Sequence, residues 1–528
     1  MAEDRPAPEG TAASGQDPRS NPDVAARDLL FTAAIFVLAL LPRLYVAIAW
    51  TREPVWDGHY YHFGAQRIAA GLGYSDDVHT AAGAIWHPWC HYPVGYSGFL
   101  ALVYQVFGAR PITGTVANAI VGAALAAVVH RLARRALSPG RARIAAILVA
   151  LSPGLILYSA LLMTEVLAAT GILTALWLLA RDLGPGQRAA TIEAWPWRGA
   201  ILAGLVLGLT TLVRPQSIVL APALALVAWS PALLRGNGDP GNRIRELRRA
   251  ASVAAIATIA ALVVVLPWTA RNCRVMDGCA FVSTNGGWNL AIGSFPRATG
   301  RFETLRASDF PERPRTDGCP VATGQVAQDR CWRIEGTSWI MTDPGRWLAL
   351  IPKKLGFTFD HESFPVGYLG EANPGAWPEE RRAWWRGFLS TTHRALLTAA
   401  ALAFVALPSS LRRREGRAAA IVQIGALGVV GVLSLRGFLG NAHSFWPLAL
   451  LIPVLAIARL PGSPRIGGIL GYLAFVTASV AATHAVFFGE DRYHIVLTPA
   501  LCILAAAALR RQPVPSAPEP TALLAPPS

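Results

Sequence analysis

The chain has 528 residues, of which 53% are hydrophobic and 15% are charged, and its formal net charge is +15. Apolar runs of roughly 17–25 residues recur along most of its length, as bilayer-spanning helices require, so the composition excludes an ordinary soluble protein. The positive charge alone would suit nucleic-acid binding. The arginines instead cluster in short loops between apolar runs, which is the positive-inside pattern of a multispanning membrane protein.

The chain begins with a polar stretch, 1–28, rich in Pro, Ala and Asp, and we expect a disordered cytoplasmic tail without a cleavable signal peptide. The first span is expected at about 29–50. An external loop rich in His, Tyr, Trp and Gly follows at 51–93. The next apolar piece, 94–107, is short for a span and reads as a re-entrant or interfacial helix. If it did span the membrane, every later orientation would be reversed.

Alternating apolar and basic segments then predict the remaining spans. They are expected at about 111–129, 144–158, 166–180, 199–212, 218–234, 250–268, 387–407, 418–435, 445–458, 466–488 and 495–509. The prediction is therefore an all-α polytopic membrane protein of about 12–13 helices with its strongest basic clusters on one side. Its parts are the tail, a catalytic membrane module at 29–268, an external segment at 269–386, further membrane helices at 387–511 and a disordered tail at 512–528.

One acidic residue stands at the first membrane–water boundary. Asp57 lies in V-W-D-G-H-Y-Y at 55–61, directly after the first apolar run. A carboxylate with limited access to bulk water at this place suggests a general base. The alternative is that Asp57 caps the helix that follows, since Asp is a good N-cap residue.

The predicted topology places several ionisable residues beside spans on the outer face. They are Asp57, Glu165, Arg214, Lys353, Lys354, Glu490, Asp491 and Arg492. Ionisable groups at membrane depth are costly and usually mark function. We therefore expect them to line one outward-facing cavity.

The external segment contains four cysteines. In an oxidising compartment they can form two disulfides, most simply Cys273–Cys279 and Cys319–Cys331. Other pairings, including ones that use Cys90, stay open. The sixth cysteine, Cys502, falls inside the last span and is expected to serve as a small apolar residue.

Several stretches resemble the bacterial relatives of protein O-mannosyltransferases and the aminoarabinose transferases, within the GT-C group of membrane glycosyltransferases. The likeness runs from about 29 to 510. It rests on Asp57 with Tyr60 and Tyr61, H-Y-P-V-G-Y-S-G-F-L at 91–100, L-S-P-G-L-I-L-Y-S-A-L-L-M-T-E at 151–165, L-V-R-P-Q at 212–216, P-W-T-A-R-N at 267–272, S-T-N-G-G-W-N-L at 283–290 and D-R-Y-H at 491–494. Many members have Asp-Glu at the first motif, whereas Gly58 follows Asp57 here.

The resemblance implies an inverting transferase that takes a hexosyl or pentosyl group from a polyprenyl-phosphate donor. Asp57 would be the base for an acceptor hydroxyl. Glu165 would orient the acceptor or share a divalent ion with Asp57, or it would only be an acid at a helix N-terminus. The acceptor is expected to be an envelope protein, lipid or polysaccharide at the outer face of the inner membrane.

The leaving phosphate needs cations, because Arg binds phosphate bidentately and Lys binds it as a point charge. The candidates are Arg214, Arg271, Lys353, Lys354 and Arg492. The candidates for acceptor or sugar contacts are Tyr60, Tyr61, His62, Tyr92 and Tyr493. The one cofactor considered is a divalent cation, with Asp57, Glu165 and His59 as candidate ligands.

Two other functions fit parts of the pattern. A transporter or flippase of lipid-linked saccharides would share the hydrophobicity and the charged cavity but would perform no chemistry. It should show internal repeats and broken helices at the midplane, and no clear repeat is visible. A structural assembly factor of the envelope would have no need of Asp57.

Overall fold

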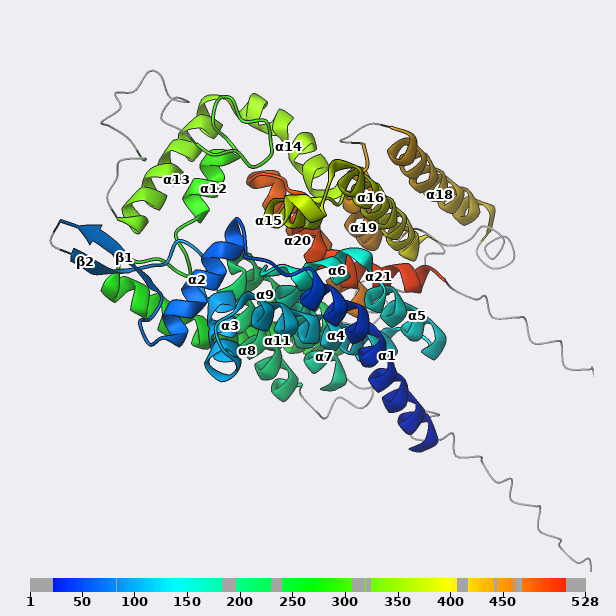
Figure 1. The fold of residues 1–528 in the computed structure, drawn as a ribbon. Helices are drawn as coiled ribbons and strands as arrows, with labels where there is room; N and C mark the ends of the chain where they lie inside the picture. The colour runs from blue at the N-terminus through cyan, green and yellow to red at the C-terminus, as the bar shows by residue number, and fades with distance from the viewer. Residues whose placement is uncertain are drawn as a thin grey trace, which may run out of the picture.

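The computed structural model describes residues 22–81, 83–182, 196–228, 240–305, 319, 324–405, 416–440, 444–458, 460 and 468–509. Most of these residues are helical (Figure 1). The tail at 512–528 lies outside the described residues, as do residues 1–21 of the first tail. Residues 183–195, 406–415 and 461–467, most of which belong to predicted basic loops, also lie outside them. Helix α1 (Pro22–Ala49) already begins at Pro22, so the last part of the expected tail is helical.

Packed helices form the N-terminal half. After α1, it includes α4 (Pro111–Ala136), α5 (Pro139–Ala150), α7 (Glu165–Asp182), α8 (Trp197–Val213) and α11 (Pro240–Val275). Helix α4 packs between α1 and α7, and α8 packs between α7 and α11. The helices are rich in Ala, Leu and Val and bury much of that surface against one another.

Small residues allow α8 and α11 to approach closely. A Cβ added to Gly204 or Gly208 would meet the backbone of α11 at Ala257 or Ala261. These two glycines are four residues apart and lie on one face of α8. This small-residue spacing is typical of helix pairs in membranes, where close van der Waals packing drives association.

Five helices of the described chain are long and apolar enough to cross a membrane. They are Ala25–Ala49, Pro111–Ala136, Arg243–Val275, Arg417–Leu439 and Gly468–Val486. A sixth span results if the pair 139–150 and 153–160, bent by 47°, is counted as one. The prediction of a helical membrane protein is confirmed. The 12–13 spans are not seen as single long helices, because other apolar segments form shorter or broken ones.

The broken segments include several predicted spans. The segment expected at 218–234 begins as the short helices η3 (Pro215–Val219), α9 (Leu220–Ala223) and α10 (Ala225–Ala228). Helix α6 (Pro153–Leu157) and η2 (Tyr158–Ala160) continue α5 after its bend. Helix α3 (Val94–Phe107) has the expected bounds. Its 14 residues extend over about 21 Å, which is less than the thickness of the hydrocarbon core.

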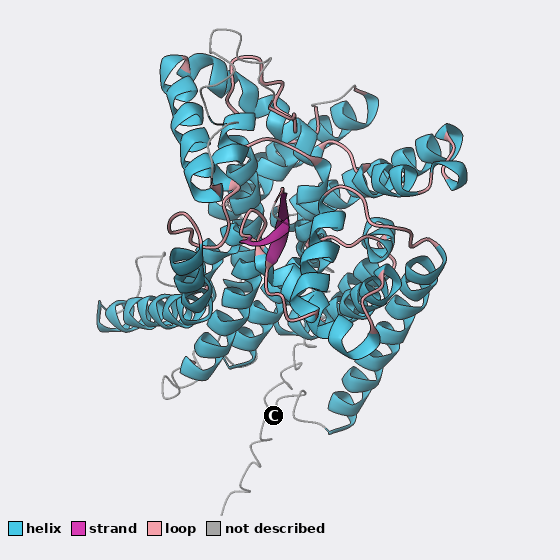
Figure 2. Cartoon of the chain, turned by 60° about the vertical axis from the view of Figure 1, so that its left-hand side comes forward, coloured by secondary structure: helices cyan, strands magenta, loops and turns pink. Residues whose placement is uncertain are grey.

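A β-hairpin is the main departure from the all-α prediction. Strand β1 (Ser75–Thr80) pairs antiparallel with β2 (Gly83–Pro88), with Ser75 opposite Pro88 and Thr80 opposite Gly83 (Figure 2). It follows α2 (Asp57–Ala69), which packs on α3. The hairpin lies in the loop that was expected to be external.

The segment predicted as external also forms helices. They are α12 (Gly286–Ile292), α13 (Gln325–Thr342), α14 (Pro344–Phe359), α15 (Phe364–Ala372) and the 3-10 turn η7 (Pro374–Ala376). Figure 1 shows α12, α13 and α14 together on one side of the helix bundle. Disulfides join Cys273 to Cys279 and Cys319 to Cys331. Cys90 and Cys502 are free and buried.

The C-terminal part returns the chain to the bundle. It contains α16 (Glu379–Ala401), η8 (Leu402–Phe404), α18 (Gly416–Leu439), α19 (Pro447–Ala458), α20 (Gly468–Val486), η9 (Asp491–Leu497) and α21 (Thr498–Ala508). Helix α21 is buried along nearly its whole length and packs against α5 and α16. The 3-10 helix η9 packs against α7 and α14, and so brings the D-R-Y-H motif to the N-terminal half.

Candidate active site

Asp57 is the first residue of α2, and its side chain does not cap the helix. The N-cap position is Trp56, whose side chain makes no capping hydrogen bond. Trp56 has a φ of 51°, an uncommon conformation for a residue with a side chain. Its ring packs against Phe364 and Tyr368 at 5.5 and 5.9 Å. This packing fixes the turn that presents Asp57.

Both carboxylate oxygens of Asp57 have partners from distant parts of the chain. The Tyr92 hydroxyl donates to Oδ1 over 3.0 Å, and the Arg492 guanidinium donates to Oδ2 over 2.5 Å. Burial and the nearby Asp57 charge raise the pKa of Tyr92, so its hydroxyl keeps its hydrogen and donates it. The Asp57 side chain is 22% exposed and that of Arg492 is 13% exposed. The carboxylate is therefore held in place but open to a small molecule.

Arg492 is the centre of a larger charged cluster. Its Nε lies 2.5 Å from Oε2 of Glu490, and its guanidinium lies over the rings of Phe364 and Tyr493 at 5.1 and 5.0 Å. The pKa of Glu490 is raised to about 7 by burial, although the charge of Arg492 opposes this shift. Two carboxylates thus share one arginine at the start of η9.

A second ion pair also lies against the ring of Tyr493. The guanidinium of Arg214 donates to Oε1 of Glu165 over 2.5 Å and to Thr164 over 3.1 Å, and it lies 5.6 Å from the centre of the Tyr493 ring. Glu165 is the first residue of α7 and is fully buried. Its Oε2 has no hydrogen-bond partner. Glu165 is therefore both an acid at a helix N-terminus and a member of the charged cluster.

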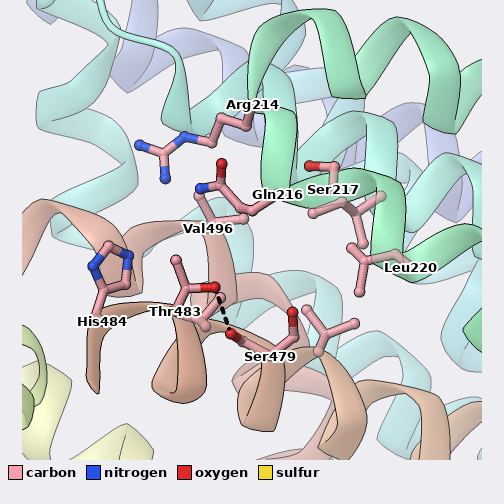
Figure 3. Close-up of a pocket in the computed structure, with 11 residues that line it drawn as sticks. Arg214, Gln216, Ser217, Leu220, Ser479, Thr483, His484 and Val496 are labelled. Carbon is pink, nitrogen blue, oxygen red and sulfur yellow. Dashed lines mark hydrogen bonds between the residues drawn. The ribbon is translucent and has the colours of Figure 1, made fainter. Parts of the chain in front are cut away.

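A pocket opens beside this second pair. Figure 3 shows Arg214 and His484 at one end and Ser217, Leu220 and Ser479 at the other. The walls come from η3, α7, α20 and η9, and the lining is mixed polar and apolar. The Tyr493 ring stacks on His484 at 3.9 Å, which connects the pocket to the charged cluster.

The predicted aromatic residues divide into two groups. Tyr60 is exposed and stacks on Tyr92 at 5.2 Å, beside Asp57. Tyr61 is buried. Burial, together with the charge of Asp57, raises the pKa of its hydroxyl, although the charge of Arg492 opposes this shift. His62 is buried and pairs with the Tyr104 hydroxyl at 2.7 Å, which ties α2 to α3. His59 is exposed at the start of α2.

Three of the five predicted phosphate-binding cations are placed differently from Arg214 and Arg492. Arg271 donates to the carbonyls of Trp89 and Tyr74 and so holds the ends of the hairpin segment. Lys353 is exposed, whereas the Nζ of Lys354 is buried and donates to the carbonyls of Ala485 and Val486 at the end of α20. A phosphate-binding role for these three residues stays a prediction.

The two lysines allow a matched pH experiment. Burial, with a smaller effect of the Arg346 charge, lowers the pKa of Lys354 from 10.5 to about 7. The unfolded chain binds this proton up to about pH 10.4, so between about pH 7 and 10 it holds more protons than the folded chain, and stability must rise with pH. We expect Lys354→Met to lose part of the rise in melting temperature between pH 7 and 9.5, and Lys353→Met to keep it. Equal pH profiles for the two variants would contradict this.

The structure explains the glycine that follows Asp57. A Cβ at Gly58 would collide with the hydroxyl of Tyr368. The Asp-Glu pair of related motifs therefore does not fit this backbone. We expect Gly58→Glu to destabilise the protein by about 1–3 kcal/mol through overpacking. Gly98→Ala is the control, because its Cβ would meet open space. A melting temperature of Gly58→Glu equal to that of the control would refute the clash.

Several side chains of the site were not predicted from the sequence. Tyr368 and Thr164 carry no local signal, although Thr164 precedes the predicted Glu165. The described residues also contain one group able to hold a metal ion, Glu362 with His393 and His494. It does not include the predicted Asp57, Glu165 or His59. Of these three residues, only His494 is adjacent in sequence to a predicted site residue, Tyr493 of the D-R-Y-H motif.

Comparison with known proteins bears on this site. Residues 91–270, about a third of the chain, match the model of the dolichyl-phosphate-mannose-protein mannosyltransferase family. The predicted resemblance is confirmed over this segment. It carries Tyr92, Glu165 and Arg214, three residues of the site. No curated protein sequence matches the chain significantly.

Solved structures of two membrane transferases are similar to the chain at low identity. The oligosaccharyltransferase AglB from Archaeoglobus fulgidus, in complex with an inhibitory peptide and a dolichol-phosphate, is 15% identical with a TM-score of 0.38, and the match covers 90% of this chain and 50% of that one. ArnT from Cupriavidus metallidurans bound to undecaprenyl phosphate is 14% identical with a TM-score of 0.37, covering 88% and 78%. The chain thus spans about half the length of AglB.

Proposed function

We propose that the chain is an inverting glycosyltransferase that moves a sugar from a polyprenyl-phosphate donor to an acceptor of the cell envelope, with Asp57 as general base. One observation carries the proposal. A partly exposed carboxylate is held between a tyrosine hydroxyl and an arginine that come from opposite ends of the chain. A base must lie within hydrogen-bond reach of the hydroxyl from which it takes a proton, and Asp57 is accessible for such a contact.

The two arginines supply the charge that the donor needs. When the sugar departs, the lipid phosphate carries negative charge, and planar guanidinium groups bind phosphate through paired hydrogen bonds. Arg214 and Arg492 both lie against the ring of Tyr493, so they belong to one site. In the proposed reaction a donor phosphate takes up the hydrogen bonds of Arg492, which frees Asp57 for the acceptor.

Glu165 assists the proposed reaction by holding Arg214 in place. Its Oε1 holds Arg214, and its buried Oε2 is left without a partner. A buried unpaired acceptor costs free energy, so a donor from the substrate would be favoured there. Glu165 therefore orients Arg214 and can accept a hydrogen bond from a sugar or acceptor hydroxyl.

The proposed location rests on the composition of the helices and on the predicted charge pattern. Five helices of the described chain are long and apolar enough to cross a membrane, and the basic loops were predicted on the face opposite to Asp57. We place the site at the outer face of the inner membrane, where a multi-pass protein meets both the lipid-linked donor and an envelope acceptor.

A transfer assay tests the proposal. Membranes that contain the wild-type chain are incubated with radiolabelled polyprenyl-phosphate sugars, one donor at a time, and total envelope acceptors. Label should move into a protein, lipid or polysaccharide fraction, which names the acceptor class. If no donor gives transfer while labelled donor crosses the bilayer of proteoliposomes, the chain is a flippase and the proposal is wrong.

A further inference from the structure

Three metal-ligating side chains converge inside the protein, apart from the ion pairs that hold Asp57 and Glu165. Glu362 lies between α14 and α15, His393 lies on α16, and His494 lies on η9. Their exposed fractions are 5%, 3% and 0%, and one ligand atom from each lies within 4.8 Å of the others. The two histidine rings stack at 3.8 Å.

Backbone carbonyls fix the tautomers of both histidines. Nδ1 of His494 lies 2.7 Å from the Thr358 carbonyl, and Nε2 of His393 lies 2.9 Å from the Phe359 carbonyl. A carbonyl only accepts, so each of these nitrogens carries the hydrogen. The other nitrogen of each neutral ring then presents a lone pair. Carbonyls that orient a histidine in this way are common behind metal ligands.

Within the described part of the chain, these lone pairs lack sufficient hydrogen-bond partners. Nε2 of His494 faces Oε2 of Glu362 at 3.2 Å. Nδ1 of His393 and Oε1 of Glu362 are buried and have no hydrogen-bond partner among the described residues. A proton on Glu362 would satisfy His494 but would leave His393 unpaired. Buried unpaired acceptors are unfavourable, and a cation among them removes the deficit for all three groups.

We propose that Glu362, His393 and His494 bind a divalent transition metal, for which zinc is the best fit. Two imidazole nitrogens and one carboxylate are a ligand set that zinc takes, with water as the fourth ligand, whereas calcium and magnesium prefer oxygen ligands. With metal–ligand distances near 2.1 Å, tetrahedral ligands lie about 3.4 Å apart. The separation of 3.2 Å between His494 and Glu362 is close to this value. The ligand nitrogen of His393 lies within 4.8 Å of the other two ligand atoms, so His393 must move toward them to complete the set.

The metal would hold together three segments that position the active site. His494 is two residues after Arg492 on η9. Ser363, which follows Glu362, donates its backbone N–H to the carboxylate of Asp491, directly before Arg492. The ion would therefore lock η9 against α16 and the α14–α15 turn, and so hold Arg492 beside Asp57. Its role is structural, and the inference stands whether or not the proposed transfer reaction is correct.

Metal content gives the direct test. The full chain is purified in detergent without added metal or chelator, and bound metals are measured by inductively coupled plasma mass spectrometry. We expect about one zinc ion per wild-type chain and near-background zinc in His393→Asn and Glu362→Gln. His130→Asn is the matched control. His130 is also fully buried, with one nitrogen bonded to Thr32 and the other unpaired, but it has no neighbouring ligand set.

A second measurement, on the wild-type protein, tests the site even if the ligand variants fold poorly. Bound metal is first removed from the wild-type protein with a chelator. The protein is then titrated separately with Co²⁺ and with Zn²⁺, and the melting temperature is recorded in both titrations. Co²⁺ also gives visible absorption bands when nitrogen and oxygen ligands bind it. Bands and a rise in melting temperature in the wild type and in His130→Asn support the site. A wild-type protein that contains no metal and responds to neither ion would overturn it, whatever the outcome of the transfer assay.

Discussion

Asp57→Asn is expected to lower the transfer rate by about 10²–10⁴-fold, the usual contribution of a positioned general base. Asparagine keeps the shape of the side chain and can still accept from Tyr92, but it cannot take a proton from an acceptor. Arg492 keeps its second carboxylate partner, Glu490, so the cluster should retain its structure. The loss should therefore appear in kcat at unchanged expression and melting temperature.

The control for this experiment is Asp77→Asn. Asp77 also pairs with an arginine, Arg67 on α2, at 2.5 Å, but Asp77 itself lies on the hairpin and its side chain is 38% exposed. We expect nearly wild-type transfer from this variant. If Asp57→Asn also transfers sugar at the wild-type rate, then Asp57 is not the base and the role must be sought at Glu165.

The second large effect is expected on stability. Arg214→Ala removes the cation that neutralises Glu165, whose side chain is fully buried. Breaking a buried ion pair by removal of one partner leaves an uncompensated charge and typically costs about 3–5 kcal/mol. We expect a large fall in the melting temperature measured in detergent micelles, together with loss of transfer.

The matched comparison is Arg67→Ala, which breaks an ion pair with a more exposed partner. The side chain of Asp77 is 38% exposed, and pairs of this kind contribute about 0–1 kcal/mol. The double variant Arg214→Met with Glu165→Leu should recover much of the stability, since it leaves no buried charge, but no transfer. If the melting temperature falls no more for Arg214→Ala than for Arg67→Ala, then Glu165 does not carry an uncompensated charge in the Arg214→Ala variant.

Local patterns in the sequence were sufficient for most of the helices. Apolar runs bounded by arginines and prolines predict segments that the structure shows as helices, and α3 has the expected bounds. A bilayer helix satisfies its own backbone hydrogen bonds, so its apolar run is visible without knowledge of its neighbours. The hairpin β1–β2 was not predicted, because its strands are short, β1 is mostly polar, and both ends are held partly by Arg67 and Arg271 from other elements.

The two lysines show why side-chain roles need the tertiary structure. Lys353 and Lys354 are adjacent in sequence and were given the same role. Successive residues of an α-helix point about 100° apart. On α14 this rotation leaves Lys353 exposed and turns Lys354 onto the end of α20.

Composition and the helical period predict the class of protein, most of its helices and the family likeness, because both are local properties. The same patterns mark Asp57, Glu165, Arg214 and Arg492 as unusual, since charges beside apolar runs are costly. Which of these charges form pairs, and how Glu362, His393 and His494 come together from three separate segments, is visible only in the folded chain. Contacts between residues far apart in the chain depend on how the helices pack, and no local spacing records that packing.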